Sequence, residues 1–178
     1  MKQSGTAIFL DIDGVLQPLS SQKRFKYDLE ELRKQLAISY KNEQYLEMDP
    51  YDLGAVYYDW DKEAVERLRK ICTDFDAGII ITSDWRIYSP LSRLKDYFHL
   101  HDLDIYIKGE ISREGGGFRN EKVADYLKDH SDIHRFVILD DAYTDRFEKS
   151  FPDQFVYCPR IFNEDCYQKA RGILQKNS

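Results

Sequence analysis

Short apolar runs alternate along the chain with longer segments in which apolar residues recur every three or four positions. Three of the runs are continuously apolar and end at polar residues, which is typical of strands buried on both faces. Such alternation is typical of a parallel sheet covered by helices. We therefore predict an α/β fold with a doubly wound parallel sheet of about five strands and helices on both faces. The strand candidates are residues 7–10, 78–81, 105–107, 136–139 and 155–157.

The segments between the strand candidates predict helices. Residues 61–72 place their apolar side chains on one stripe. Ser89 and Pro90 supply an N-cap and a first helical position for a second helix, which continues to Phe98. Further helices are predicted over residues 28–38, 120–128 and 165–175.

The segment of residues 15–59 is the irregular part of the chain. Apart from its one predicted helix, it is rich in tyrosine and acidic residues. We predict that it forms a flap or small cap inserted after the first strand. The stretch of residues 82–122 already holds a predicted helix and strand, so no second cap fits there. Residues 1–178 then form a single domain, since 178 residues is the length of one domain.

Composition narrows the functional classes. Lys and Arg number 26 against 32 Asp and Glu, and the net charge of −6 excludes a whole-surface electrostatic hold on nucleic acid but not a local basic patch. The cysteines Cys72, Cys158 and Cys166 are scattered and odd in number, which fits a reducing compartment better than a disulfide framework or a zinc site. The first residues do not read as a signal peptide, and no apolar run approaches the roughly 20 residues of a membrane span. We expect a cytoplasmic protein without a membrane partner.

The first strand candidate ends in two carboxylates, Asp11 and Asp13, followed by Gly14. In a parallel sheet this position lies at the carboxyl edge, where ligands bind. A divalent cation there would let one Asp attack phosphorus while the other exchanges protons with the leaving oxygen. The alternative is an Asp-rich turn capped by glycine, which is common for an isolated pair of this kind.

Three later positions repeat the pattern of polar residues at strand ends or helix starts. Thr82 and Ser83 follow the second strand candidate, Lys122 lies near the start of a later helix, and Asp140 and Asp141 follow the fourth strand candidate. Each has an alternative interpretation: an ordinary strand-end hydroxyl, a solvated lysine, and helix-capping carboxylates.

The order of these groups resembles the four motifs of the haloacid dehalogenase (HAD) superfamily of phosphohydrolases, which share a Rossmann-like sheet. The resemblance implies that Asp11 is the nucleophile that forms an aspartyl-phosphate. It implies that Asp13 is the general acid and base, with its backbone carbonyl facing Mg²⁺. Thr82 would donate a hydrogen bond to a phosphoryl oxygen, with Ser83 as the neighbour able to take that role.

The same resemblance implies a cation for the phosphate and further ligands for the metal. Lys122 would hold the phosphate and offset the charge of Asp11, with Arg119 and Lys108 as competing candidates. Asp140 would bind the metal, assisted by Asp141 or by Asp145. The expected metal-binding residues are Asp11, Asp13, Asp140 and Asp141.

Two further stretches of the sequence bear on the identity of the substrate. Residues 83–86 resemble the S-x-W-R stretch in a subset of these phosphatases associated with polynucleotide end repair. In that interpretation Arg86 clamps a phosphate and Trp85 stacks on a base; in the alternative, Trp85 packs in the interior. Residues 23–26 either contact a nucleic acid backbone or form a solvated turn.

The sequence thus predicts a Mg²⁺-dependent phosphohydrolase that acts on a large phosphorylated substrate such as a polynucleotide end. A small-molecule phosphatase, for example a nucleotidase, is the alternative enzyme. A non-catalytic domain that binds a phosphorylated ligand is the alternative of another class, and the intact pair of Asp11 and Asp13 argues against it.

Overall fold

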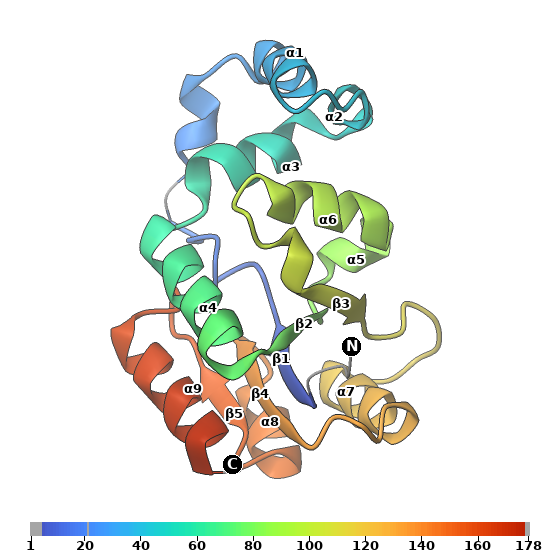
Figure 1. Ribbon diagram of the computed structural model, residues 1–178, viewed down its shortest axis with the longest axis vertical. Helices are drawn as coiled ribbons and strands as arrows, with labels where there is room; N and C mark the ends of the chain where they lie inside the picture. The colour runs from blue at the N-terminus through green and yellow to red at the C-terminus, as the bar shows by residue number, and fades with distance from the viewer. Residues whose placement is uncertain (1–4, 21, 177–178) are drawn as a thin grey trace.

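The computed structural model describes residues 5–20 and 22–176, so positions 1–4, 21 and 177–178 of the predicted domain lie outside the described residues. Five parallel strands form one sheet in the order β3-β2-β1-β4-β5 (Figure 1). The prediction of a doubly wound, all-parallel α/β sheet is confirmed. The strands are β1 (Thr6–Leu10), β2 (Gly78–Ile81), β3 (Ile107–Glu110), β4 (Arg135–Asp140) and β5 (Phe155–Tyr157).

Successive side chains of a strand point to opposite faces of the sheet, and in β1 both sets are buried. Helices therefore cover both faces. Ile8 and Leu10 of β1 belong to the larger apolar cluster, whereas Phe9 belongs to the smaller one on the other face. Helices α4 (Lys62–Phe75), α6 (Leu91–His99) and α9 (Glu164–Lys176) contribute to the larger cluster. Helices α7 (Arg119–Asp129) and α8 (Thr144–Ser150) contribute to the smaller one.

The segment between β1 and α4 folds into short helices, which we call the helical cap (residues 22–59). Its helices α1, α2 and α3 gather at the top of Figure 1. Asp28 caps α1 by accepting a hydrogen bond from the Glu31 amide, and Leu32 packs into the same apolar cluster as β1. The cap therefore shares the main core. Its elements are η1 (Lys23–Lys26), α1 (Leu29–Ser39), α2 (Gln44–Glu47), α3 (Pro50–Gly54) and the π-helical turn η2 (Ala55–Asp59).

The predicted strand at residues 105–107 is wrong in position. The 3₁₀ turn η3 (Asp104–Tyr106) occupies most of that segment, and β3 begins at Ile107. Ile105 is exposed, so its apolar side chain does not mark a buried strand. The true edge strand contains the exposed Lys108 and a glycine, which gives it a weak apolar pattern.

Two local predictions near α6 also need correction. Pro90 is the N-cap residue of α6 rather than its first helical residue, and no side chain caps the helix. The short helix α5 (Trp85–Tyr88) precedes it and was not expected, because four residues carry no detectable period. No helix within the described residues is long and apolar enough to cross a membrane.

Candidate active site

The carboxyl ends of β2, β1 and β4 bring the predicted polar residues side by side. The Thr82 amide donates to the Leu10 carbonyl at 2.9 Å, and the Asp11 amide donates to the Leu139 carbonyl at 3.0 Å. These bonds continue the parallel ladder just past the strand ends. Since β1 lies between β2 and β4, Asp11 occupies the middle of this edge.

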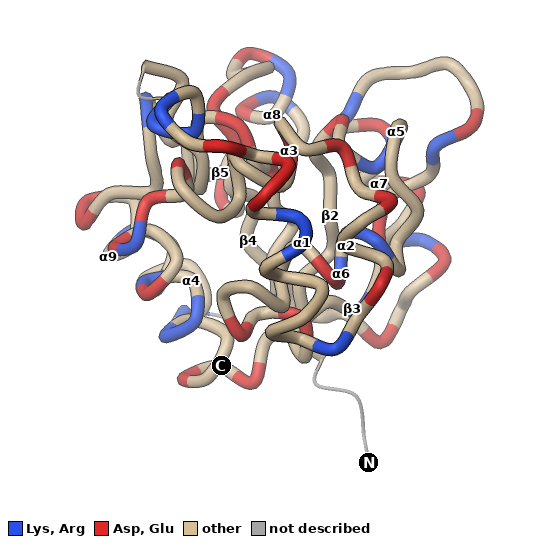
Figure 2. The backbone as a smooth tube through the Cα atoms, turned by 90° about the horizontal axis from the view of Figure 1, so that it is seen from above, with Lys and Arg blue, Asp and Glu red and all other residues tan. Residues whose placement is uncertain are grey.

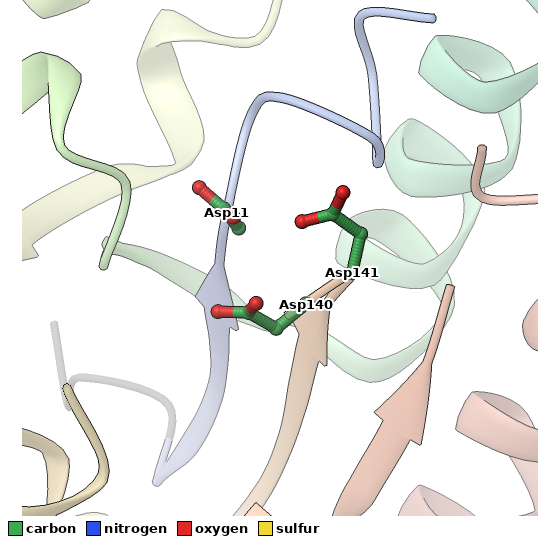
Figure 3. A group of neighbouring side chains, drawn as sticks. All are labelled: Asp11, Asp140 and Asp141. Atoms are coloured by element: carbon green, nitrogen blue, oxygen red, sulfur yellow. The ribbon is translucent and has the colours of Figure 1, made fainter. Parts of the chain in front are cut away.

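Three carboxylates form the acidic group of the site. Asp11, Asp140 and Asp141 each offer an oxygen, and these oxygens lie within 4.8 Å of one another. Figure 3 shows them at the ends of β1 and β4 around a common space. Asp145, the alternative partner, is exposed on α8 and does not belong to this group. A cluster of carboxylate oxygens without His or Cys suits a hard cation such as Mg²⁺.

Burial and mutual repulsion raise the pKa of two of these acids, Asp140 and Asp141. Burial, followed by the charge of Asp11, raises the pKa of Asp140 to about 7. The same two causes raise the pKa of Asp141. A cation bound among these oxygens would offset the repulsion between the carboxylates.

Arg119 supplies one positive charge to the group from the first position of α7. Its Nη1 donates to Asp11 Oδ2 at 2.7 Å and to Asp140 Oδ2 at 2.6 Å, and its Nη2 lies 3.3 Å from Asp84 Oδ1. Burial lowers the pKa of Arg119, but Asp11 and Asp140 outweigh it and hold the pKa above its usual value. The guanidinium thus bridges the two strand ends.

Thr82 carries an unsatisfied hydroxyl at the same edge. The residue is fully buried, and its Oγ1 has no hydrogen-bond partner among the described residues. Ser83 is also buried, and its Oγ accepts a long hydrogen bond of 3.5 Å from the Trp85 amide. A buried hydroxyl without a partner is uncommon and fits a ligand oxygen at this position.

Residues 7–160 match the family model described as the HAD domain in Swiss Army Knife RNA repair proteins. The chain belongs to this family. No curated protein and no solved structure matches it significantly. The resemblance inferred from the four motifs is confirmed, including the subset associated with polynucleotide repair. Family membership and the acidic group together support a phosphohydrolase of the HAD type.

The three candidate cations occupy different places in this HAD domain. Lys122 lies further along α7, and its Nζ donates to the Ser112 carbonyl at 3.3 Å. Lys108 is exposed, donates to the Ile105 carbonyl, and packs beside Gly78 at the start of β2, away from the carboxyl edge. Of the three, Arg119 is the one that contacts Asp11.

Asp13 of the HAD domain is oriented by Trp85. The indole Nε1 donates to Asp13 Oδ2 at 3.0 Å, and the ring packs against Trp60 and Tyr97. Burial raises the pKa of Asp13, although the Trp85 hydrogen bond opposes this, and the charge of Asp11 adds to the rise. The sequence leaves Trp85 open between base stacking and packing, and the structure shows packing.

Arg86 is built into the loop of the second HAD motif. The sequence predicts a phosphate contact for it, but the side chain is buried and its Nη1 donates to the carbonyls of Thr82 at 2.6 Å and Ser83 at 2.8 Å. The same nitrogen contacts Asp84 at 3.1 Å. The structure therefore places Arg86 behind Thr82, as a clamp on the loop that carries the hydroxyl.

Gly14 completes the first HAD motif for two steric reasons. Its φ of +71° lies in the left-handed region that side chains disfavour. A Cβ at this position would also lie 2.1 Å from Asp141 Oδ2. The first and last motif loops are in direct contact here.

Two residues of the site escaped the sequence analysis. Asp84 pairs with Arg119 and with Arg86, and the ring of Tyr143 lies 5.0 Å from the Arg119 guanidinium carbon. Asp84 stands inside the S-x-W-R stretch, so its position was a usable signal. Tyr143 follows the paired acids by two residues, and no sequence pattern marks it.

Proposed function

We propose that this chain is a Mg²⁺-dependent phosphohydrolase that removes a phosphate from a polynucleotide end through a phospho-aspartate on Asp11. The observation that carries the proposal is the contact of Arg119 with both Asp11 and Asp140, with Asp141 beside them. A carboxylate nucleophile can approach a phosphate dianion only where positive charge offsets the repulsion. The Arg119 bridge supplies part of that charge at the nucleophile itself.

Two displacements at phosphorus complete the reaction. An Asp11 oxygen attacks phosphorus, the ester P–O bond breaks, and Asp13 gives its proton to the leaving oxygen. Asp13 then takes a proton from a water molecule, whose oxygen attacks phosphorus and breaks the bond to Asp11. Inorganic phosphate and free Asp11 result. The raised pKa of Asp13 favours its role as the acid of the first step.

The other residues bind and orient the phosphate. Arg119 donates to phosphoryl oxygens while it neutralises Asp11, and the unpaired Thr82 hydroxyl donates to another oxygen. Mg²⁺, when bound, neutralises the charge of the transferring group and helps to align it with Asp11. Asp11, Asp140 and Asp141, with the backbone carbonyl of Asp13, would hold the metal.

The metal requirement should shift when a ligand is neutralised. Asp140→Asn is expected to raise the Mg²⁺ concentration for half-maximal phosphate release at least about 10-fold, because an amide oxygen is a weaker ligand than a carboxylate. The measurement is a Mg²⁺ titration of phosphate release. Asp145→Asn is the matched control, since Asp145 is exposed and outside the acidic group. Full activity of the wild type after exhaustive chelation would contradict the metal assignment.

The substrate proposal rests on the family and on the size of the cap. The family model describes domains of RNA repair proteins, and the helical cap is a short insertion rather than a full second domain. We expect kcat/KM for a single-stranded RNA with a terminal phosphate to exceed that for the matching mononucleotide by about 10-fold or more at moderate salt. Oligonucleotides carrying 3′ or 5′ phosphates identify the preferred end. Equal values, or a preference for the mononucleotide, would favour a nucleotidase.

A further inference from the structure

The helical cap carries a cluster of exposed aromatic rings that the catalytic mechanism does not use. Tyr27 and Tyr58 stack in parallel with ring centroids 3.9 Å apart, and Tyr57 meets Tyr58 edge-on. Phe25 and Tyr51 form a second pair at 6.0 Å. Phe25 is 59% exposed, Tyr51 56% and Tyr27 52%, so these rings are largely on the surface. We call these five residues the aromatic platform.

Two chain segments, residues 25–27 and 51–58, build the aromatic platform. Its members come from η1 and the following residue, from α3, and from the π-helical turn η2. Single exposed apolar residues are ordinary, but several exposed aromatic rings on one part of the cap are typical of a binding surface. Four of the five rings are tyrosines, whose hydroxyls tolerate water, and the mutual stacking of Tyr27 and Tyr58 covers only one face of each.

Basic residues lie on both sides of Phe25 in the chain. Lys23 and Lys26 flank Phe25 and are exposed, and neither takes part in an ion pair within residues 5–20 and 22–176. The Arg24 guanidinium lies 4.9 Å from the Phe25 ring centre and pairs with buried Asp59 at 2.6 Å. Asp59 is therefore engaged and does not oppose the two lysines.

Acids also border the platform: Asp52 follows Tyr51, and two others cap helices. Asp28 accepts from the Glu31 amide, and Asp49 accepts from the Tyr51 amide. Figure 2 shows that acidic and basic residues are otherwise interspersed over the molecule. The combination of free lysines and exposed rings on this part of the cap is thus a local feature, compatible with a net charge of −6.

A short chain of contacts connects the aromatic platform with the catalytic edge. Asp59, which holds Arg24, precedes Trp60, and the Trp60 ring lies 6.5 Å from that of Trp85. Trp85 in turn donates to Asp13. Arg24 is also near enough to lower the pKa of Asp13 slightly. Asp52, beside Tyr51, also interacts with Asp13. Residues next to both Phe25 and Tyr51 thus lie near the catalytic edge, and an RNA with its phosphate at Asp11 would reach the exposed rings.

We propose that the aromatic platform and its lysines bind the unpaired nucleotides next to the terminal phosphate of a single-stranded RNA. This inference rests on the proposed function for its placement of the RNA end. Base faces stack on exposed aromatic rings independently of sequence, and the lysines neutralise backbone phosphates. A duplex hides its base faces, so the surface selects single strands.

The test measures binding separately from catalysis. Fluorescence anisotropy with an unphosphorylated single-stranded RNA of about 10 nucleotides reports the platform alone. The double variant Phe25→Ala/Tyr51→Ala is expected to weaken binding at least about 10-fold, because two rings on which bases stack are removed. Ile38→Ala is the matched control, as Ile38 is 78% exposed on the same cap but lies outside the platform. Its affinity for RNA should equal that of the wild type.

A second variant tests the contribution of the lysines to binding, and a second substrate tests whether the variants remain folded and active. Lys23→Ala/Lys26→Ala should reduce the salt dependence of binding, since fewer counterions are released. Turnover of a phosphorylated mononucleotide should be unchanged in every variant, which also verifies that they fold. Wild-type affinity in Phe25→Ala/Tyr51→Ala, failure of the wild type to bind RNA, or equal binding of a duplex would each overturn the inference. RNA binding that needs the platform, without phosphate release from any phosphorylated end, would instead refute the proposed function alone.

Discussion

Replacing Asp11 by Asn is expected to reduce phosphate release by at least about 10³-fold while leaving the fold intact. The amide is nearly isosteric with the carboxylate but is a poor nucleophile. Its one oxygen can accept from Arg119 or from the Ile12 amide but not from both, while the change also removes a negative charge that faces Asp140. Because these effects oppose each other, the thermal unfolding temperature should change little.

Initial rates with a phosphorylated oligonucleotide, at saturating Mg²⁺, measure this effect. Asp145→Asn makes the same chemical change in an exposed residue of α8 and should retain wild-type rates. A near-normal rate in Asp11→Asn would remove Asp11 from the nucleophile role. Trapping of the phosphorylated intermediate in the wild type, and not in the variant, would support that role directly.

Replacing Arg119 by Ala should damage both activity and stability. We expect phosphate release to fall about 10²- to 10³-fold, because the charge that offsets Asp11 and binds the phosphate is lost. We also expect the free energy of unfolding to fall by about 3 kcal/mol, since Asp11 and Asp140 are left buried without their partner. Chemical denaturation and steady-state kinetics measure the two effects.

Lys122→Ala is the matched control for this experiment, because Lys122 lies on the same helix and contacts a carbonyl rather than an active-site acid. Its rate of phosphate release should stay within about two-fold of the wild-type rate. Its free energy of unfolding should stay within about 0.5 kcal/mol of the wild-type value. Arg119→Lys keeps the charge but cannot donate to both carboxylates in the same geometry, so it should fall between the two. A large loss in Lys122→Ala with normal Arg119→Ala would return the phosphate-binding role to Lys122.

Sequence patterns located the strands that carry the site because those strands are buried on both faces. The apolar runs that end at Asp11, Thr82 and Asp140 coincide with β1, β2 and β4, and parallel pairing then requires their ends to meet at one edge. The polar residues that follow these strands are therefore also brought together at that edge. The edge strand β3 has no such continuous run, and its predicted position was wrong by two residues at its start and three at its end.

Sequence patterns could not determine which basic residue contacts Asp11, nor what Arg86 contacts. Arg119 and Lys122 lie three residues apart on α7, and only the position of the helix against β1 and β4 determines which of them meets Asp11. The glycine-rich loop before α7 carries no pattern that would set this position. Arg86 has a charge suited to phosphate, but its burial depends on how the Thr82 loop folds back over it.

The contact of Gly14 with Asp141 limits how this protein can diverge. A residue larger than glycine at position 14 would push the Asp141 carboxylate away from Asp11 and Asp140, besides straining its own backbone. Two loops that are 127 positions apart in the chain therefore cannot accept substitutions independently. A substitution at Gly14 would therefore be tolerated only together with a substitution or a changed side-chain position at residue 141, so we expect the two positions to co-vary among homologues.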